Sequence, residues 1–362
     1  MSKILFIIDH LGCGGAEKIT LQLAEYLAKQ DHIIYLAVLN GQRNHYHCSS
    51  LVHYTDLQIT ESFAYGKMWK NKTLTHYEKQ KIDQLLAYGF DLIITGYNNG
   101  HWLAPYLKGN VWHWIHGDLL EIRRFNNPLK QLKEHIRFLK NKRKFSKLFR
   151  NRNLITVNRD LENKARTYSN PNSIKTIANG VNIPFKYLNR YPITEKKWDV
   201  IFVGRLVPIK QVDHAITAFS MSNTNGRMAI VGDGTERQKL EELTKELKIA
   251  DRVDFLGWVD NPYKFISESK CLILTSQYES FGLVLAESIT LNTPVIAYNC
   301  SSGVEDIFHL QKNMKKYLIQ HNDINMLSNK IQNCIKSPYA IHKETKEILH
   351  IKNMASSFLS II

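Results

Sequence analysis

Residues 271–298 read CLILTSQYESFGLVLAESITLNTPVIAY and contain a complete strand–helix–strand pattern. Apolar residues fill Cys271–Leu274 and most of Pro294–Tyr298, and runs of this length are typical of buried strands. Between them, Leu283–Leu291 has the apolar spacing of a helix. Two strands joined by a crossover helix pair in parallel, so this stretch predicts a parallel α/β sheet.

The same alternation of strands and helices continues along the rest of the chain. In the second half we expect strands at Val200–Val203, Met228–Val231 and Val253–Leu256, and helices at Val212–Met221 and Glu236–Leu247. In the first half we expect strands at Ile4–Ile8, Ile33–Leu39, Asp91–Thr95 and Val111–Ile115, and helices at Ala16–Gln30 and Thr73–Tyr88. These patterns predict two doubly wound, Rossmann-like α/β domains that face each other across a cleft.

A chain of 362 residues is long enough for two such domains. We expect an N-terminal domain over residues 1–180 and a C-terminal domain over 198–345. The proline-containing segment 181–197 has no clear period and is the expected linker. Residues 346–362 predict a C-terminal helix that can pack back on the N-terminal domain.

Most of the net charge of +15 lies in one short segment. Residues 123–152 carry twelve Lys and Arg residues and one acidic residue, Glu134. In this segment Leu129, Leu132, Ile136 and Leu139 follow one another at steps of three, four and three residues, which is helical spacing. A basic amphipathic helix suits an anionic membrane surface. The alternative is an ordinary surface helix whose Leu/Ile stripe faces the domain core. Nucleic acid is disfavoured as a partner because no recognised binding module accompanies the charge.

Composition also limits the class of protein. Hydrophobic residues make up 44% of the chain, as in a folded globular protein, and no apolar run is long enough to span a bilayer. Asp9 and His10 interrupt the first apolar run, so we expect no signal peptide. Five scattered cysteines without C-x-x-C spacing predict reduced intracellular thiols rather than disulfides or a zinc site.

The turn inside the opening stretch carries residues suited to binding a diphosphate. Glu279 lies at the carboxyl end of the strand, and Glu287 follows on the helix. The backbone N–H groups of Phe281, Gly282 and Leu283 open that helix, and free amides at a helix start bind phosphate oxygens. Glu287 can accept hydrogen bonds from ribose hydroxyls, although a glutamate near a helix N-terminus is also a routine partner of the helix dipole.

Two other loops join a strand to a helix and favour an anion. Gly204-Arg205 and Lys210 follow one strand and precede a helix, where cations oppose the helix dipole unless an anion is bound. Gly14-Gly15 follows the first strand and lets the backbone approach a ligand closely, although a tight turn alone also explains these glycines. The spacing is not that of a dinucleotide-binding G-x-G-x-x-G motif.

In this order the motifs resemble those of the retaining nucleotide-sugar glycosyltransferases of family 4, which have the GT-B fold. Three further stretches have the family's pattern: Ile177–Asn182, Val231–Arg237 and Val253–Trp258. Each piece is weak or moderate by itself, but the ordered set runs from residue 4 to about residue 310 and is highly specific.

The resemblance implies a role for each matching residue. Arg205 and Lys210 would hold the leaving diphosphate. Glu279 would face the donor sugar, and His116, which follows an expected strand of the first domain, would lie near that sugar. The implied substrate-binding residues are Gly14, Gly15, Gly204, Ser280, Phe281, Gly282, Leu283, Glu287 and Trp258. Of these, Glu287 would bind the ribose, and Gly14-Gly15 would line the acceptor side.

The sequence departs from the family's commonest pattern at two positions. Ser280 stands where a glycine often precedes the phenylalanine, and the loop Tyr298–Asp306 lacks the usual proline. The first change leaves the phosphate-binding amides in place but alters the sugar pocket.

The resemblance implies retaining transfer of a hexosyl group from a nucleotide sugar, with UDP as the expected nucleotide. The expected acceptor is a cell-envelope glycan such as lipopolysaccharide or a lipid-linked oligosaccharide. No Asp-x-Asp motif occurs in the chain, so we expect no metal or other cofactor. With the basic segment 123–152, this predicts a cytoplasmic enzyme bound peripherally to the inner membrane. The alternatives are a sugar-nucleotide epimerase of the same fold and a non-enzymatic module that binds anionic lipid or nucleic acid.

Overall fold

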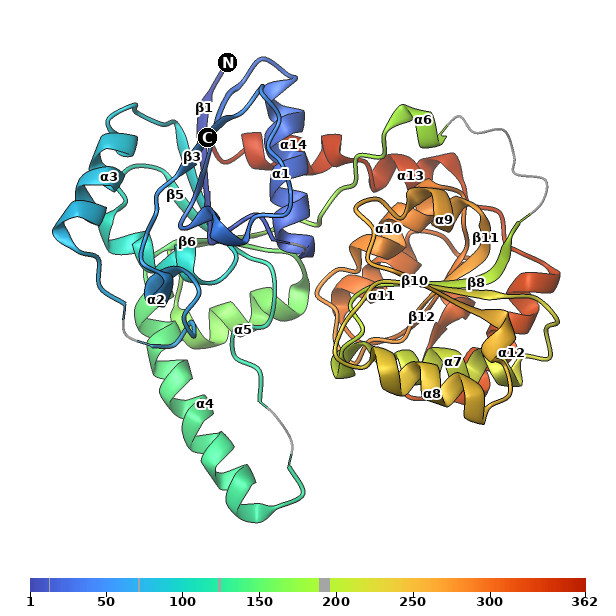
Figure 1. The fold of residues 1–362 in the computed structure, drawn as a ribbon. Helices are drawn as coiled ribbons and strands as arrows, with labels where there is room; N and C mark the ends of the chain where they lie inside the picture. The colour runs from blue at the N-terminus through green and yellow to red at the C-terminus, as the bar shows by residue number, and fades with distance from the viewer. Residues whose placement is uncertain (13, 71, 123–124, 189–195) are drawn as a thin grey trace. The chain divides into compact units, whose positions relative to one another are not determined.

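The structure is a computed structural model, and it divides the chain into two compact units (Figure 1). The first unit comprises Met1–Asn179 and Ile351–Ile362, and the second comprises Gly180–His350. The residues that it describes are 1–12, 14–70, 72–122, 125–188 and 196–362.

The first unit contains a seven-stranded parallel sheet in the order β3-β2-β1-β4-β5-β6-β7. Its strands are β1 (Lys3–Ile8), β2 (Ile33–Val38), β3 (His53–Asp56), β4 (Leu92–Gly96), β5 (Val111–Ile115), β6 (Asn153–Thr156) and β7 (Ser173–Thr176). Its helices are α1 (Gly15–Ala28), α2 (Glu61–Ala64), α3 (His76–Leu86), α4 (Pro128–Phe149), α5 (Arg159–Ser169) and α14 (Ile351–Leu359), with 3₁₀ turns η1 (Gly41–Arg43) and η2 (Asn99–Tyr106).

The second unit contains a six-stranded parallel sheet in the order β10-β9-β8-β11-β12-β13. Its strands are β8 (Trp198–Val203), β9 (Met228–Val231), β10 (Val253–Gly257), β11 (Ser269–Leu274), β12 (Val295–Tyr298) and β13 (Leu318–Ile319). Its helices are α6 (Phe185–Leu188), α7 (Val212–Met221), α8 (Arg237–Glu246), α9 (Tyr263–Ser267), α10 (Leu283–Thr290), α11 (Ser302–His309), α12 (Ile324–Lys336) and α13 (Lys343–Ile348), with 3₁₀ turns η3 (Pro208–Lys210), η4 (Ala250–Arg252) and η5 (Lys315–Tyr317).

The predicted class, two doubly wound parallel α/β domains, is confirmed. The central strands of both sheets are fully buried, which explains why they appear in the sequence as continuous apolar runs. The sequence reading missed the strands β3, β6, β7 and β13. They are four residues long or shorter and carry polar residues or lie at a sheet edge, so they give no apolar run to detect.

Part of the segment expected to be a linker is packed into the second unit. Val181 and Ile183 are buried in its core, and the ring of Tyr187 on α6 lies 5.5 Å from that of Tyr263. Residues 189–195 of the expected linker lie outside the described residues. At the other end of the chain, α14 belongs to the first unit, where the ring of Phe358 lies 4.8 Å from that of Trp114.

The basic segment 123–152 contains the 22-residue helix α4. Its buried side chains, Phe145, Leu148 and Phe149 among them, contact the first unit. In Figure 1 the N-terminal half of α4 extends beyond the rest of that unit.

The Leu/Ile stripe of α4 is exposed. Its four residues are accessible over 45 to 72% of their surface: Leu129, Leu132, Ile136 and Leu139. At 100° per residue, this stripe lies on the side of the helix opposite the buried side chains. The alternative in which the stripe faces the domain core is therefore wrong.

Candidate active site

Backbone contacts hold the strand-end loops of the second unit together. The Gly204 amide donates to the Val231 carbonyl at 2.9 Å, and the Gly232 amide donates to the Gly257 carbonyl at 2.7 Å. Gly232 has a φ of +141°, and a Cβ there would lie 1.9 Å from the carbonyl oxygen of Gly204. The loops after β8, β9 and β10 therefore form one rigid rim at the carboxyl end of the sheet, where α/β proteins bind their ligands.

Lys210 and Glu279 form an ion pair at this rim. The Lys210 Nζ donates to Glu279 Oε2, although 69 residues separate the two in the chain. Their loops are joined by the Thr275 hydroxyl, which donates to the Lys210 carbonyl at 2.9 Å, and by the Gln277 amide, which donates to the Ile209 carbonyl at 2.8 Å. Because the two side chains are 17 and 23% exposed, this pair remains open to a ligand.

The first turn of α10 lies next to this pair. Gly282 caps the helix with a φ of +84°, and buried Phe281 anchors the turn. A Cβ on Gly303 would lie 2.1 Å from the Ser280 carbonyl oxygen, so α11 begins in close contact with the same turn. Within the described residues no acceptor is bound to the amides of Phe281, Gly282 or Leu283. They remain available to an anion.

The other predicted residues of this unit differ in their surroundings. Arg205 is exposed, and its guanidinium has no hydrogen-bond or ion-pair partner in the part of the chain that the structure describes. Glu287 is only 4% exposed and accepts a hydrogen bond from the Tyr263 hydroxyl at 3.3 Å. Trp258 follows β10 and is exposed. The structure thus brings Lys210 and Glu279 into contact and places Glu287 against α9.

Cys300 is a neighbour of this pair that sequence reasoning missed. Burial, reinforced by the negative charge of Glu279, raises the pKa of its thiol to about 12. The Cys300 thiol is therefore uncharged beside the Glu279 carboxylate. Its place directly after β12, at the same sheet edge as Lys210 and Glu279, was the signal that could have identified it.

In the first unit, His116 directly follows β5. Its ring lies 4.1 Å from that of Trp114, and its Nε2 is buried without a hydrogen-bond partner among the described residues. Burial lowers the pKa of His116 to about 3. The imidazole is therefore neutral at physiological pH, so it can exchange a hydrogen bond with a substrate but supplies no positive charge.

The predicted glycine loop of the first unit faces a carboxylate of its own chain. Gly14 is the N-cap of α1, and a Cβ there would lie 2.3 Å from Oε2 of the buried Glu17. The His10 Nδ1 lies 3.7 Å from the other oxygen of Glu17. Sequence reasoning did not single out Glu17. Its position as the third residue of α1, where acidic side chains favour the helix dipole, was the available signal.

Two other buried histidines in this unit make its stability depend on pH. Burial lowers the pKa of His101 to about 3 and lowers that of His113 well below its usual value. Both Nδ1 atoms contact the Thr95 hydroxyl, at 2.9 and 2.6 Å. Asp9 has the opposite effect on the pH dependence of stability, because burial raises its pKa to about 7.

We expect the first unit to lose stability as the pH falls from 6 to 4.5. The unfolded chain protonates His101, His113 and His116 near pH 6.5 while the folded chain does not, and each contributes up to about 1.4 kcal/mol per pH unit. Asp9 keeps its proton longer in the folded state and cancels about one of these three contributions. Urea unfolding monitored by hydrogen exchange of the β4 and β5 amides should show a net loss of about 4 kcal/mol. A constant free energy of unfolding would contradict the neutral state of the three histidines.

Comparison with known proteins identifies the class. Residues 13–184 match the family model described as Glycosyltransferase Family 4, and residues 185–349 match the model for glycosyl transferases group 1. Together with the two doubly wound sheets, these matches show that the chain belongs to the family 4 glycosyltransferases, with the GT-B fold. It is therefore a glycosyltransferase.

Three individual relatives share between 17 and 31% sequence identity with this chain. The N-acetylgalactosamine-N,N'-diacetylbacillosaminyl-diphospho-undecaprenol 4-alpha-N-acetylgalactosaminyltransferase of Campylobacter jejuni is 26% identical over 85% of this chain and 84% of its own. The lipopolysaccharide 1,6-galactosyltransferase of Escherichia coli is 31% identical, over 34% of this chain and 36% of its own. The crystal structure of HepE from Anabaena in complex with UDP and glucose has a TM-score of 0.70 and 17% identity, and covers 99% of both chains.

The described residues contain no group of three or more His, Cys, Asp or Glu side chains that could hold a metal ion. None of their helices is both long enough and apolar enough to cross a bilayer.

Proposed function

We propose that the protein transfers a hexosyl group, with retention of configuration, from a UDP-sugar to a hydroxyl of a cell-envelope glycan. The observation that carries the proposal is the Lys210–Glu279 pair beside the open first turn of α10. Negative charge grows on the leaving diphosphate as the glycosidic bond breaks. Preorganised cations and amides at that position lower the barrier. In this proposal Lys210, Arg205 and the amides take the place of a metal ion.

The roles of the remaining residues follow from the same proposal. Glu279 faces the donor sugar, Glu287 binds the ribose and Trp258 flanks the nucleobase. For Glu287 to reach the ribose, the hydroxyl of Tyr263 must share or release the carboxylate. His116, which is neutral, exchanges a hydrogen bond with the sugar, and the Gly14-Gly15 loop lines the acceptor side.

The comparisons support this choice of donor and acceptor. One relative is named for transfer to a diphospho-undecaprenol-linked sugar and another for transfer to lipopolysaccharide, and HepE was crystallised with UDP and glucose. Both of these acceptors are cell-envelope glycans.

A thermal-shift screen of UDP- and GDP-sugars, followed by NMR of the product, tests the function. We expect stabilisation by one or a few UDP-sugars and a product whose anomeric configuration matches the donor. Stabilisation only by GDP-sugars would contradict the proposed nucleotide, and an inverted product would contradict retention. Rapid release of free sugar or epimerised donor without an acceptor would favour the epimerase.

We further propose that α4 binds the protein to the anionic cytoplasmic face of the inner membrane. The exposed stripe Leu129, Leu132, Ile136 and Leu139 would enter the interfacial region of the lipid. Lysine side chains flank this stripe at helical positions within about 80° of it, close enough to contact anionic headgroups. Charge complementarity and the exposed stripe support a lipid surface rather than a protein partner.

Replacing the stripe should weaken membrane binding. The triple variant Leu129→Ser/Leu132→Ser/Ile136→Ser should lower partition onto anionic vesicles about a hundredfold, since each side chain contributes roughly 1 kcal/mol at the interface. Vesicle sedimentation with phosphatidylglycerol measures this change. The double variant Leu51→Ser/Tyr77→Ser, at exposed apolar residues outside α4, is the control and should bind like the wild type. Equal binding by the triple variant would contradict docking through α4.

A further inference from the structure

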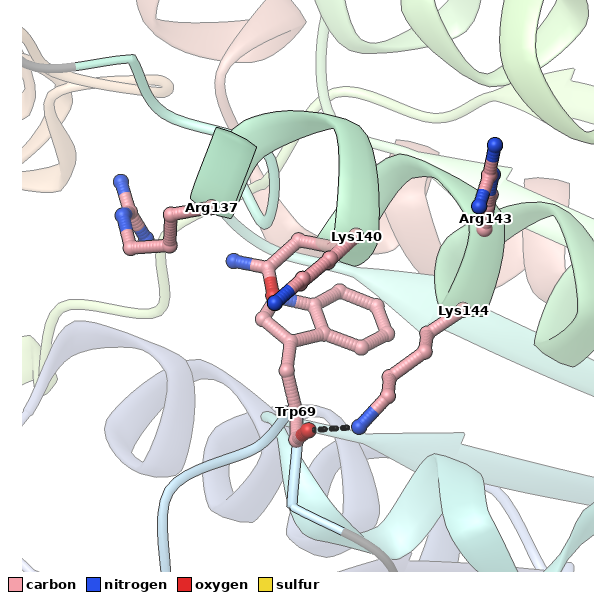
Figure 2. Close-up of a pocket in the computed structure, with 6 residues that line it drawn as sticks. Trp69, Arg137, Lys140, Arg143 and Lys144 are labelled. Atoms are coloured by element: carbon pink, nitrogen blue, oxygen red, sulfur yellow. Dashed lines mark hydrogen bonds between the residues drawn. The ribbon is translucent and has the colours of Figure 1, made fainter. Parts of the chain in front are cut away.

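A cavity of about 410 Å³ lies against the side of α4 in the first unit. Its lining combines one aromatic residue with polar and cationic side chains: Trp69, Arg137, Lys140, Asn141, Arg143 and Lys144. Figure 2 shows the four cations along one length of the helix, with Lys140 over the Trp69 ring, Lys144 reaching to the Trp69 carbonyl and Arg143 projecting away from Trp69. A volume of this size suits a small molecule or the head of a larger one, and it exceeds what one inorganic ion fills.

The sequence of α4 aligns three of the four cations on one face, with Arg143 at the border of the apolar stripe. Arg137, Lys140 and Lys144 are separated by three and four residues, so their side chains project from the same side of the helix. The distance from Arg137 to Lys144 along the axis is about 10.5 Å. Cations spread over this length can contact more than one phosphate group.

Trp69 forms the opposite wall and is held in place from several directions. Its indole N–H donates to the Leu119 carbonyl at 3.0 Å. Its ring packs edge-on against Trp102 at 6.3 Å and lies 6.2 Å from the ring of Phe145, which is buried on α4. The Lys144 Nζ donates to the Trp69 carbonyl at 2.5 Å, the dashed bond in Figure 2. The wall is therefore preorganised by contacts that involve no ligand.

The positive charge of the cavity is only partly balanced by the protein. Arg137 forms an ion pair with Glu134 and donates to the Glu121 carbonyl at 3.0 Å. Lys140 and Arg143 have no hydrogen-bond or ion-pair partner within the residues described. Like charges one turn apart repel each other and destabilise a helix. An anion bound in the cavity would reduce this repulsion. Lys and Arg together favour phosphate, because its oxygens can pair with the lysine ammonium and accept two parallel hydrogen bonds from the arginine guanidinium.

We propose that this cavity binds the diphosphate of a lipid-linked acceptor, an inference that rests on the proposed transfer to a cell-envelope glycan. The source of the diphosphate follows from the neighbouring residues. Ile136 and Leu139 of the exposed stripe directly precede Arg137 and Lys140, so lipid-facing and phosphate-facing side chains alternate along the same turns. A lipid-linked diphosphate at the membrane surface can therefore contact the cations while its lipid contacts the apolar stripe. The donor diphosphate is assigned to Lys210 and Arg205 of the other unit.

Soluble probes separate this site from general attraction to a membrane. We would measure binding of farnesyl diphosphate, inorganic diphosphate and farnesol by calorimetry at fixed salt. The wild type should bind farnesyl diphosphate more tightly than either of the other two. The variant Lys140→Gln/Arg143→Gln should lose at least about tenfold in affinity, because two charge-assisted contacts are removed. The charge-matched variant Lys130→Gln/Lys133→Gln, on α4 but outside the cavity, should lose less than about threefold.

Each contrary outcome overturns a stated part of the inference. Equal losses in the two double variants would show attraction to the charge of the whole helix rather than to the cavity. Inorganic diphosphate binding as tightly as farnesyl diphosphate would show an anion site without lipid specificity, and equally tight farnesol would show an apolar site. Circular dichroism of each variant checks the fold, which these exposed substitutions should not change.

A second measurement keeps this inference distinct from the proposed function. The Lys140→Gln/Arg143→Gln variant should keep the wild-type affinity for UDP and lose transfer to a prenyl-diphosphate-linked sugar through a raised KM. If it transfers to such an acceptor with the wild-type KM, the inference fails while the function stands. If the wild type binds farnesyl diphosphate but transfers no sugar to any glycan, the function fails, and the cavity stands as a lipid-diphosphate site.

Discussion

Lys210→Ala should lower kcat for sugar transfer by about 10²- to 10³-fold, the usual loss when one preorganised group that stabilises transition-state charge is removed. The Lys210 ammonium lies beside Glu279, at the sheet edge where α10 begins, and is partly open to solvent. Since the charge on a leaving diphosphate grows only as the bond breaks, the loss should fall mainly on kcat rather than on KM. Steady-state transfer with the donor found in the screen measures both constants.

Lys239→Ala on α8 is a matched control for this prediction. Lys239 belongs to the same unit and pairs with Glu236, but its side chain is 72% exposed. Its removal should leave kcat unchanged within about twofold, as expected for a surface pair. Near-normal activity of Lys210→Ala would contradict the proposed diphosphate site. If Lys210→Ala also unfolds, Lys210→Gln keeps the packing of the side chain and retests the charge alone.

The sequence could predict those site residues whose positions follow from the order of strands and loops along the chain. Arg205 and Lys210 lie in the loop after β8, and Glu279 lies in the loop after β11, the neighbouring strand of the same parallel sheet. Strands of a parallel sheet end at the same edge, so their C-terminal loops were expected to converge. The ion pair between Lys210 and Glu279 is the observed result for two of them.

Other features required side-chain packing that no sequence pattern specifies. The four residues of the Leu/Ile stripe have the spacing of a core-facing stripe. The structure instead exposes them and buries Phe145 and Phe149 on the opposite side of α4. The cavity beside α4 needs Trp69, which is 68 residues before Arg137 and is positioned by Trp102. Glu287 has the spacing of a ribose ligand, yet the structure places it against Tyr263.

Gly232→Ala should destabilise the second unit by about 3 kcal/mol or more, through two costs at one position. The φ of +141° lies in a region that costs a residue with a Cβ about 1–3 kcal/mol. The new Cβ would also lie 1.9 Å from the carbonyl oxygen of Gly204, a backbone atom that cannot rotate away. The loops after β8 and β9 must then separate, which moves Gly204 and Arg205 away from the rim.

Gly257→Ala separates the two costs. Gly257 also has a positive φ, +71°, but the nearest atom to its Cβ would be a side-chain nitrogen of Arg237 at 3.8 Å. It should therefore cost only about 1–2 kcal/mol, the penalty for the left-handed conformation alone. Hydrogen exchange of the β8 and β9 amides in both variants measures the difference. Similar protection in the two variants would show that the strand-end loops can separate at little cost, and would contradict the rigid rim on which the placement of Lys210 and Arg205 depends.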